Sequence, residues 1–381
     1  MTVQDSDPFA AGAADGRRVA LIHYWLVGMR GGEKVLEALC RMFPQADIFT
    51  HVVVPERISP ALRRHAIYQT RVGRLPFAPR LYQKYLPLMP RALEELDLSG
   101  YDLVISSESG PAKGVIAPPN APHLCYCHSP MRYLWDQYTL YLNGAGGLTR
   151  LMMPHLAHPL RQWDVTSAAR VDGFVANSAF VARRIEKYWR RGADVVHPPV
   201  AVQEFAPIPA AERGDYYLWV GELTHYKRPD IAVEAFRRLG LPFKMVGGPD
   251  KLAKALARQA GPRTQILGKR PFAELKALMA GCKALIFPGE EDFGMVPVEA
   301  MAAGRPVIAL GRGGALETVV EGETGLFFHD QSVEALVDAV ERFEASGLGR
   351  DCTAACVARA ADFSEERFVA GIRASLARIG A

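Results

Sequence analysis

Short apolar runs alternate with amphipathic stretches along most of this 381-residue chain. Runs such as 18–27, 101–106 and 284–287 are typical of buried strands, and each leads into a polar or glycine-bearing loop. Amphipathic segments with a helical period then follow. A repeated strand–loop–helix unit predicts parallel sheets covered by helices, with ligands at the carboxyl ends of strands and the amino ends of helices.

The pattern is clearest between residues 284 and 317. A strand over 284–287 leads into a polar loop, and Pro297 is expected at the first position of the next helix, where its missing N–H costs nothing. That helix should end at Gly304, because glycine suits the turn that follows a helix. A second strand and a second glycine loop follow, so this unit is where we expect a ligand.

Two carboxylates flank the start of this helix, Glu291 on the loop and Glu299 in the expected first turn. Free N–H groups at a helix start attract phosphate, which a carboxylate would repel. The two glutamates therefore fit the hydroxyls of a sugar or ribose beside a phosphate. The alternative is a solvated loop residue and a glutamate that stabilises its own helix dipole.

Composition limits the remaining possibilities. The chain is 49% hydrophobic and long enough for two domains, and its net charge of +4 is too mild to indicate nucleic acid. Six cysteines without a Cys-x-x-Cys pair predict free thiols in a reducing cytoplasm. Residues 1–16 have no cationic start, which predicts a disordered tail and not a signal peptide. No apolar run approaches the roughly 20 residues of a membrane span.

An ordered set of motifs runs through the unit at 284–317: Glu291-x-Phe293-Gly294, Glu299-Ala300-Met301-Ala302-x-Gly304-x-Pro306-Val307-Ile308, and Gly313-Gly314-x-x-Glu317. This set resembles the signature of glycosyltransferase family 4, whose members are retaining enzymes. The likeness extends from about residue 19 to about residue 368. It implies an α/β fold of the GT-B type, with two Rossmann-like domains, a cleft between them and a C-terminal helix that crosses back.

The expected boundaries follow from this resemblance and from a proline-bearing stretch after residue 198. The tail at 1–16 precedes an acceptor-binding domain at 17–198. A nucleotide-sugar-binding domain is expected at 199–360, and the returning helix at 361–381.

Two features of the first domain suggest a ligand site. Gly31 and Gly32 form a glycine loop between a strand and a helix, as at phosphate sites, although a tight turn would also need glycine. By resemblance, these glycines close on the donor diphosphate. His128 follows the strand 123–127 and is either structural or able to bond a sugar hydroxyl or shuttle a proton. The resemblance assigns His128 a catalytic place near the sugar.

In the second domain, Lys227 stands between a strand end and a helix start, where an ammonium fits a diphosphate; otherwise it is an ordinary surface lysine. The family usually holds the diphosphate with an Arg and a Lys. Lys227 matches the Lys, but Glu222 occupies the Arg position, so either Glu222 points away or Arg228 substitutes. By resemblance, Lys269 lies on the loop that contacts the base and is compatible with guanine or uracil.

Residues 126–136, Tyr-Cys-His-x-Pro-x-Arg-Tyr-x-Trp-Asp, resemble the bacterial polysaccharide mannosyltransferase branch. This resemblance implies a GDP-mannose donor and a saccharide acceptor on a polyprenyl diphosphate. It also places Arg132, Trp135 and Asp136 at the acceptor.

The segment 63–91 contains seven cations and no acidic residue, with aromatic and aliphatic residues interleaved. Basic heads beside apolar bodies suit an anionic membrane surface or a lipid substrate. Single-stranded nucleic acid and a partly buried helical hairpin are the alternatives. We expect the membrane contact and no nucleic-acid partner, which predicts a cytoplasmic protein held on the inner face of the cell membrane.

The sequence thus predicts a hexosyltransferase of exopolysaccharide or lipopolysaccharide synthesis. Glu291 would hold the sugar and Glu299 the ribose, while Lys227 and the N–H groups at Met295 and Val296 stabilise the leaving diphosphate. The alternatives are a UDP-sugar donor, an epimerase or sugar-phosphate transferase on the same architecture, and a non-catalytic nucleotide-sugar-binding protein.

No metal or other cofactor is expected. The chain has no evident Asp-x-Asp site, and His155 and His158, although spaced for a helical metal pair, have no evident third ligand. Surface histidines are the expected account of that pair.

Overall fold

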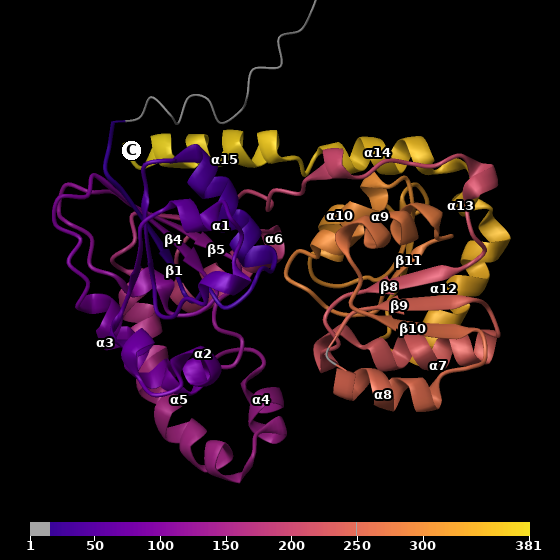
Figure 1. Cartoon of the computed structure of the whole chain (residues 1–381), viewed down its shortest axis with the longest axis horizontal. Helices are drawn as coiled ribbons and strands as arrows, with labels where there is room; N and C mark the ends of the chain where they lie inside the picture. The colour runs from indigo at the N-terminus through magenta and orange to yellow at the C-terminus, as the bar shows by residue number, and fades with distance from the viewer. Residues whose placement is uncertain (1–15, 249) are drawn as a thin grey trace, which may run out of the picture. The chain divides into compact units, whose positions relative to one another are not determined.

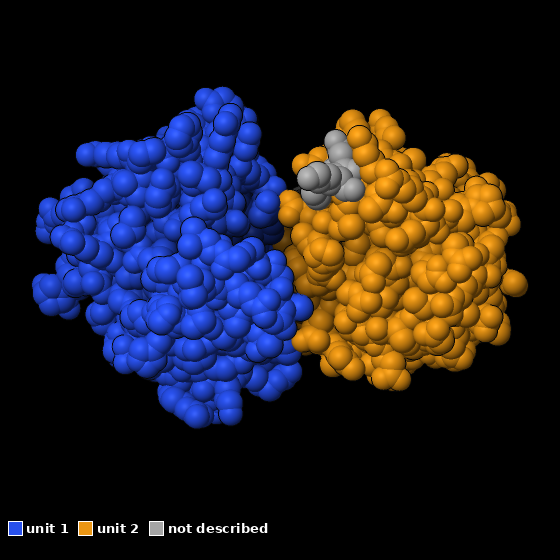
Figure 2. All heavy atoms as spheres, turned by 90° about the horizontal axis from the view of Figure 1, so that it is seen from below, with its two compact units in different colours: residues 1–199, 365–381 blue, residues 200–364 orange. Residues whose placement is uncertain are grey.

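The computed structural model describes residues 16–248 and 250–381, so the tail expected at 1–16 lies outside the described residues apart from Gly16. The chain forms two compact units, shown in blue and orange in Figure 2. Unit 1 comprises the described residues up to Pro199 together with Glu365–Ala381. Unit 2 comprises Val200–Ser364.

A seven-stranded parallel sheet in the order β3-β2-β1-β4-β5-β6-β7 forms the centre of unit 1. Its strands are β1 Val19–His23, β2 Asp47–Thr50, β3 Ile67–Gln69, β4 Leu103–Glu108, β5 His123–Cys127, β6 Gly173–Ala176 and β7 Asp194–Val195. All residues of β1, β4 and β5 are buried, as the apolar runs predicted. Because the strands are parallel, His23, Glu108 and Cys127 all lie at the carboxyl edge of the sheet.

Unit 1 also contains helices, some against this sheet and others, such as α4, beyond it (Figure 1). They are α1 Gly31–Met42, α2 Ala78–Leu81, α3 Met89–Glu94, α4 Tyr138–Gly144, α5 Gly147–Ala168, α6 Ala179–Trp189 and α15 Glu365–Arg378. Helices α4 and α5 are separated by a break at Ala145–Gly146. The cluster of glycines at this break disfavours a continuous helix, since glycine costs about 1 kcal/mol in a helix interior relative to alanine.

The C-terminal helix α15 completes the core of unit 1. Phe368 and Ile372 of α15 pack with Leu36 and Leu39 of α1 in one buried cluster. An ion pair of 2.5 Å joins Arg41 to Glu365 at the edge of this contact. In Figure 1, α15 (yellow) runs alongside α1.

Unit 2 is built around a six-stranded parallel sheet in the order β10-β9-β8-β11-β12-β13. Its strands are β8 Tyr217–Val220, β9 Phe243–Val246, β10 Thr264–Gly268, β11 Leu285–Phe287, β12 Val307–Leu310 and β13 Gly325–Phe328. Its helices are α7 Pro229–Leu239, α8 Asp250–Gln259, α9 Phe272–Gly281, α10 Met295–Ala302, α11 Ala315–Thr318, α12 Val333–Ser346, α13 Leu348–Asp351 and α14 Thr353–Ala361. The two α/β units are of the kind that the strand–loop–helix pattern predicted.

The unit at 284–317 differs from the prediction in one detail. Helix α10 begins at Met295, after Gly294 with a φ of +83°, so Pro297 is its third residue and not its first. A proline is tolerated there because the first N–H groups of a helix have no intrahelical partner. Consequently Glu299 lies in the second turn of α10. The chain leaves the helix through Gly304, whose φ is +74°.

All six cysteines are buried and free of disulfides, as predicted. Within 16–248 and 250–381, no helix combines the length and apolar character that crossing a bilayer requires.

Candidate functional site

Three loops meet at the carboxyl edge of the sheet in unit 2, those that follow β8, β11 and β12. Their backbones approach so closely that glycine is needed at the contacts. A Cβ on Gly289 would lie 2.7 Å from Lys227 Cα, and a Cβ on Gly313 would lie 2.3 Å from the carbonyl oxygen of Glu291. The glycines of the sequence motifs therefore bring Lys227 and Glu291 together.

Lys227 and Glu291 form an ion pair, with 2.8 Å between Nζ and Oε1, and their side chains are only 14% and 17% exposed. Burial lowers the pKa of Lys227, but Glu291, with smaller contributions from Tyr226 and Glu222, outweighs burial, so the net shift is upward. The lysine is thus a stable cation. The predicted sugar-binding carboxylate and the predicted diphosphate-binding ammonium lie side by side.

The two alternatives raised at the Arg position concern the surroundings of Glu222 and Arg228. The charge of Glu222 acts on Lys227, so this exposed carboxylate lies within electrostatic range of the ammonium and is not remote from it. Arg228 is bound by Asp230, with 2.7 Å between Nη2 and Oδ2, and also donates to Gln331. Arg228, the residue directly before α7, is therefore paired with a carboxylate in the first turn of that helix.

The other residues predicted in unit 2 also lie at the carboxyl edge of the sheet. Met295 and Val296 are the first residues of α10, so their N–H groups have no partner within the helix. Glu299 is buried on the same helix. Lys269 is exposed, and its stem passes over Gly248, where an added Cβ would lie 2.9 Å from Lys269 Cε.

In unit 1, Gly31 and Gly32 are the first residues of α1 and not a separate loop as predicted. The helix begins early because the backbone N–H of Arg30 donates to Glu33 Oε2 at 2.9 Å, which caps the first turn. A Cβ on Gly32 would lie 2.4 Å from Tyr24 Oη and 3.6 Å from His128 Nε2. The start of α1 and His128, predicted from distant parts of the sequence, are therefore neighbours.

His128 belongs to a row of polar side chains at the ends of β1, β4 and β5. Ser107 Oγ lies 2.9 Å from His128 Nε2 and 3.1 Å from His23 Nδ1. The other ring nitrogen of His23 lies 3.9 Å from Glu33 Oε1. Burial, with a smaller contribution from His23, lowers the pKa of His128 to about 3, so the ring is neutral at neutral pH. The ring can therefore form hydrogen bonds but carries no positive charge.

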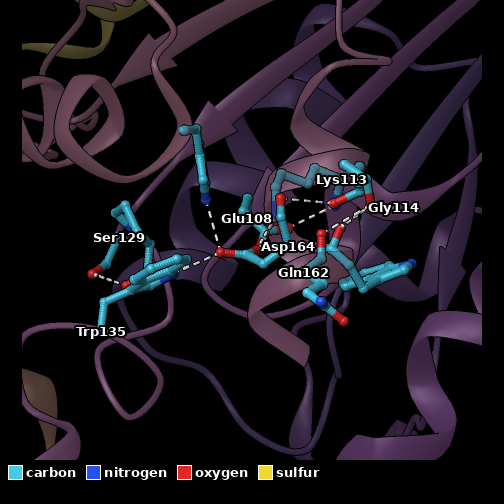
Figure 3. A network of polar contacts seen from close by, with 12 residues as sticks. Glu108, Lys113, Gly114, Ser129, Trp135, Gln162 and Asp164 are labelled. Carbon is cyan, nitrogen blue, oxygen red and sulfur yellow. Dashed lines mark hydrogen bonds and ion pairs between the residues drawn. The ribbon is translucent and has the colours of Figure 1, made fainter. Parts of the chain in front are cut away.

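A buried charge network, which sequence reasoning missed, lies nearby (Figure 3). Lys113 pairs with Asp164 and has its Nζ 4.0 Å from Glu108 Oε1, and all three side chains are fully buried. The indole N–H groups of Trp135 and Trp189 donate to Asp164 Oδ2 at 2.8 and 2.7 Å. Figure 3 shows Asp164 between Trp135 and Lys113.

The network carries two carboxylates for one ammonium. Burial raises the pKa of Glu108 to about 7, because it outweighs the lowering by Lys113, and Asp164 adds to the rise. The signals available in the sequence were a glutamate directly ending a buried strand and one lysine in the otherwise uncharged stretch after it. Neither matched a motif, so the pairing required the structure.

The residues predicted at the acceptor have partners within unit 1. Trp135 stacks on Tyr188 with ring centroids 4.8 Å apart, and Asp136 pairs with Arg184 at 2.6 Å. These contacts give both residues a structural role, and their acceptor role stays a prediction. His155 and His158 are exposed on α5, and no cluster of three or more potential metal ligands occurs among the described residues.

Two family models match the chain in succession. Residues 29–204 match the model described as Glycosyltransferase Family 4, and residues 202–357 match the model described as Glycosyl transferases group 1. Together the two models span most of the chain, which is a glycosyltransferase of the family 4 type. This confirms the family that the motifs indicated, although not the mannosyltransferase branch.

Curated relatives agree with this family. A D-inositol 3-phosphate glycosyltransferase of Mycobacterium bovis is 31% identical over 210 residues, which is 49% of this chain and 43% of that protein. The chain thus matches less than half the length of the first curated relatives.

Two solved structures match the fold. Sucrose-phosphate synthase of Thermosynechococcus elongatus has a TM-score of 0.71 at 20% identity, covering 96% of this chain and 99% of that one. HepE of Anabaena in complex with UDP-glucose has a TM-score of 0.72 at 18% identity, covering 95% and 100%. The predicted α/β fold of the GT-B type is confirmed.

Proposed function

We propose that the protein is a retaining glycosyltransferase that moves a hexosyl group from a nucleotide diphosphate sugar to a saccharide acceptor. The pairing of Lys227 with Glu291 beside the amino end of α10 carries this proposal. A cation and helix N–H groups suit a diphosphate, and an adjacent carboxylate suits sugar hydroxyls. In the complex, Lys227 binds the diphosphate, Glu291 accepts hydrogen bonds from the sugar, and Glu299 accepts them from the ribose.

In the proposed reaction, the bond between the anomeric carbon and the diphosphate oxygen breaks. The acceptor hydroxyl forms the new bond from the same face, and its proton passes to the departing phosphate oxygen. Negative charge grows on the leaving group, so Lys227 and the N–H groups of Met295, Val296, Gly31 and Gly32 lower the barrier electrostatically. His128 bonds a sugar hydroxyl as a neutral ring. The proposal needs no side-chain base and no metal or other cofactor.

The proposed donor is GDP-mannose, supported by the likeness of residues 126–136 to the mannosyltransferase branch. The proposed acceptor is a saccharide on a polyprenyl diphosphate, used in exopolysaccharide or lipopolysaccharide synthesis. A UDP-sugar is the second candidate donor, because HepE was solved with UDP and with UDP-glucose. Lys269 suits the carbonyl groups of either base.

A non-catalytic nucleotide-sugar-binding protein is the second candidate function. Glu222 supports it, because it places a carboxylate near Lys227 at the position where the family usually has an arginine. A carboxylate there repels a diphosphate and weakens the stabilisation of the leaving group.

A donor screen tests these proposals. Ligands that bind the folded protein raise its Tm by mass action. We expect GDP-mannose to raise the Tm more than UDP-glucose or ADP-glucose, and to give mannosyl transfer to a polyprenyl-linked saccharide. A shift without transfer to any acceptor would favour the binding protein. No shift with any nucleotide sugar would contradict the proposed donor site.

We further propose that unit 1 contacts an anionic membrane surface, on the inner face of the cell membrane. All seven cations of the segment 63–91 are exposed, beside an exposed Phe77. Helices α4 and α5 add exposed Leu148 and Leu151, at 77% and 66%, in a stretch from 137 to 163 without acidic residues. Figure 1 shows α4 and α5 as a hairpin at the end of unit 1 far from α15. Basic and apolar groups together suit such a surface.

A further inference from the structure

We infer that Ser107 is a positioning residue that fixes the tautomer of His128, so that His128 offers an unprotonated Nδ1 to the ligand. The inference rests on the proposed function, in which His128 bonds a sugar hydroxyl. It concerns a seryl hydroxyl at the carboxyl end of β4 that lies between two histidine rings from β1 and the end of β5.

The count of hydrogens sets the first constraint. Ser107 Oγ lies 2.9 Å from His128 Nε2 and 3.1 Å from His23 Nδ1, which are both hydrogen-bond distances. A hydroxyl has one hydrogen to donate and lone pairs to accept with. Ser107 can therefore donate to at most one ring, and any ring nitrogen that does not accept this hydrogen must donate an N–H to Ser107 Oγ. The tautomers of the two rings are coupled through this single oxygen.

The surroundings of His23 decide which ring accepts the hydroxyl hydrogen of Ser107. His23 is fully buried, and its Nε2 faces Glu33 Oε1 at 3.9 Å, too long for a hydrogen bond. With a proton on Nε2, the ring turns an N–H toward this carboxylate, whereas a lone pair on Nε2 would be repelled by it. We therefore place the proton of His23 on Nε2, which leaves Nδ1 to accept the hydrogen of Ser107.

The state of His128 then follows. Because the hydroxyl hydrogen of Ser107 is used by His23, His128 Nε2 must carry a hydrogen and donate it to Ser107 Oγ. A neutral ring has only one such hydrogen, so His128 Nδ1 carries a lone pair. The lowered pKa of His128 keeps the ring neutral. His128 thus accepts a hydrogen bond from a ligand hydroxyl and does not donate one.

The chain offers a matched control on the neighbouring residue. Ser106 Oγ is also fully buried and bonds His123 Nε2 at 2.8 Å, on the opposite face of β4. Ser106→Ala thus removes a buried serine–histidine bond of the same kind without touching His128. Ser107→Ala removes the coupling, and Ser107→Thr keeps a hydroxyl.

Nitrogen-15 NMR of the ring-labelled full chain reads the tautomer directly, with His128→Gln used to assign the signals. We expect the Nε2–H tautomer for His128 in the wild type and in Ser106→Ala, and a mixture of tautomers in Ser107→Ala. An Nδ1–H tautomer in the wild type would overturn the inference, as would an unchanged Nε2–H signal in Ser107→Ala. Because this readout needs no turnover, it decides the inference even if the proposed function fails.

Kinetics supply the second readout. With the donor identified by the screen, Ser107→Ala should lower kcat/KM about tenfold, the value of one well-placed hydrogen bond. Ser107→Thr should recover most of that loss and Ser106→Ala should lose none. Equal kcat/KM in Ser107→Ala and Ser106→Ala would count against a positioning role for Ser107.

Discussion

Single charged residues dominate the chemistry of unit 2. The ammonium of Lys227 and the carboxylate of Glu291 form an ion pair at 2.8 Å in a partly enclosed position. In the proposed complex, a diphosphate sugar would supply both groups with new partners, an anion for the lysine and hydroxyls for the glutamate. Separating the two side chains costs free energy. Only a ligand with both an anionic group and hydroxyls offsets that cost.

Removing either charge should therefore impair transfer. We expect Lys227→Ala and Glu291→Ala each to lower kcat at least about a hundredfold, because electrostatic groups at a leaving group typically contribute this much. Lys276→Ala is the control, since Lys276 pairs with Glu204 on the surface of the same unit. Steady-state kinetics with circular dichroism measure the effect, and wild-type turnover in either variant would reject the role of that residue.

The buried Glu108 predicts a pH dependence of stability. Its pKa of about 7 exceeds the ordinary 4.5, so between these values the folded state holds more protons than the unfolded state. The free energy of unfolding therefore falls as the pH rises through this window. Glu108→Gln removes this dependence. The Tm of Glu108→Gln minus the Tm of the wild type should therefore be larger at about pH 8 than at about pH 5.

Thermal unfolding across this range measures the Glu108 effect. Glu366→Gln, on an exposed position of α15, is the control and should follow the wild type at every pH. A constant difference in Tm between Glu108→Gln and wild type would show that Glu108 is ionised throughout.

At the scale of elements, the first turn of α1 depends on a close contact. The backbone of Gly32 passes so near Tyr24 that an alanine Cβ would lie 2.4 Å from its hydroxyl. Gly32→Ala must displace Tyr24, and we expect a loss of about 1–3 kcal/mol in the free energy of unfolding. In Gly28→Ala, nothing lies within 4 Å of the added carbon, so urea unfolding should show almost no change. Equal effects of the two substitutions would refute the contact.

Acidic substitutions on the α4–α5 hairpin should prevent its binding to anionic membranes. We expect Leu148→Glu combined with Leu151→Glu to abolish sedimentation of the protein with vesicles rich in phosphatidylglycerol, because carboxylates oppose both burial and attraction to anionic lipid. Wild-type protein should not sediment with phosphatidylcholine vesicles. Leu316→Glu, at an exposed leucine of unit 2, should sediment like the wild type. Unchanged sedimentation of the double variant would show that α5 does not contact the membrane.

At the scale of the whole molecule, unit 1 needs residues from both ends of the described chain. Ile372 of α15 is fully buried, and we expect Ile372→Ala to cost unit 1 about 2–5 kcal/mol. Glu366→Ala, exposed on the same helix, should cost little. Limited proteolysis of the full chain measures which unit becomes susceptible, and protection of unit 1 in Ile372→Ala would contradict the packing.

The sequence predicted the architecture well because both sheets are parallel and buried, so strands appear as apolar runs such as 19–22 and 307–310. Helix starts were less predictable, since Pro297 is tolerated at the third position of α10 as well as at the first. Motifs pointed to the vicinity of Lys227 and Glu291 but not to their pairing. Ser107 and Lys113 were missed because their partners lie more than twenty and more than fifty positions away, at His128 and Asp164.

The path of the chain through α15 has a consequence for synthesis on the ribosome. Unit 2 is continuous from Val200 to Ser364, so it can fold as soon as it emerges. Unit 1 is translated first, but its core is incomplete without α15. Tyr126 and Val196 stay uncovered until Phe368 and Val369 have been made. Its core closes only after some 165 further residues have been made. We therefore expect unit 2 to complete its fold before unit 1, and a nascent chain stalled within unit 2 to expose an apolar surface that chaperones would recognise.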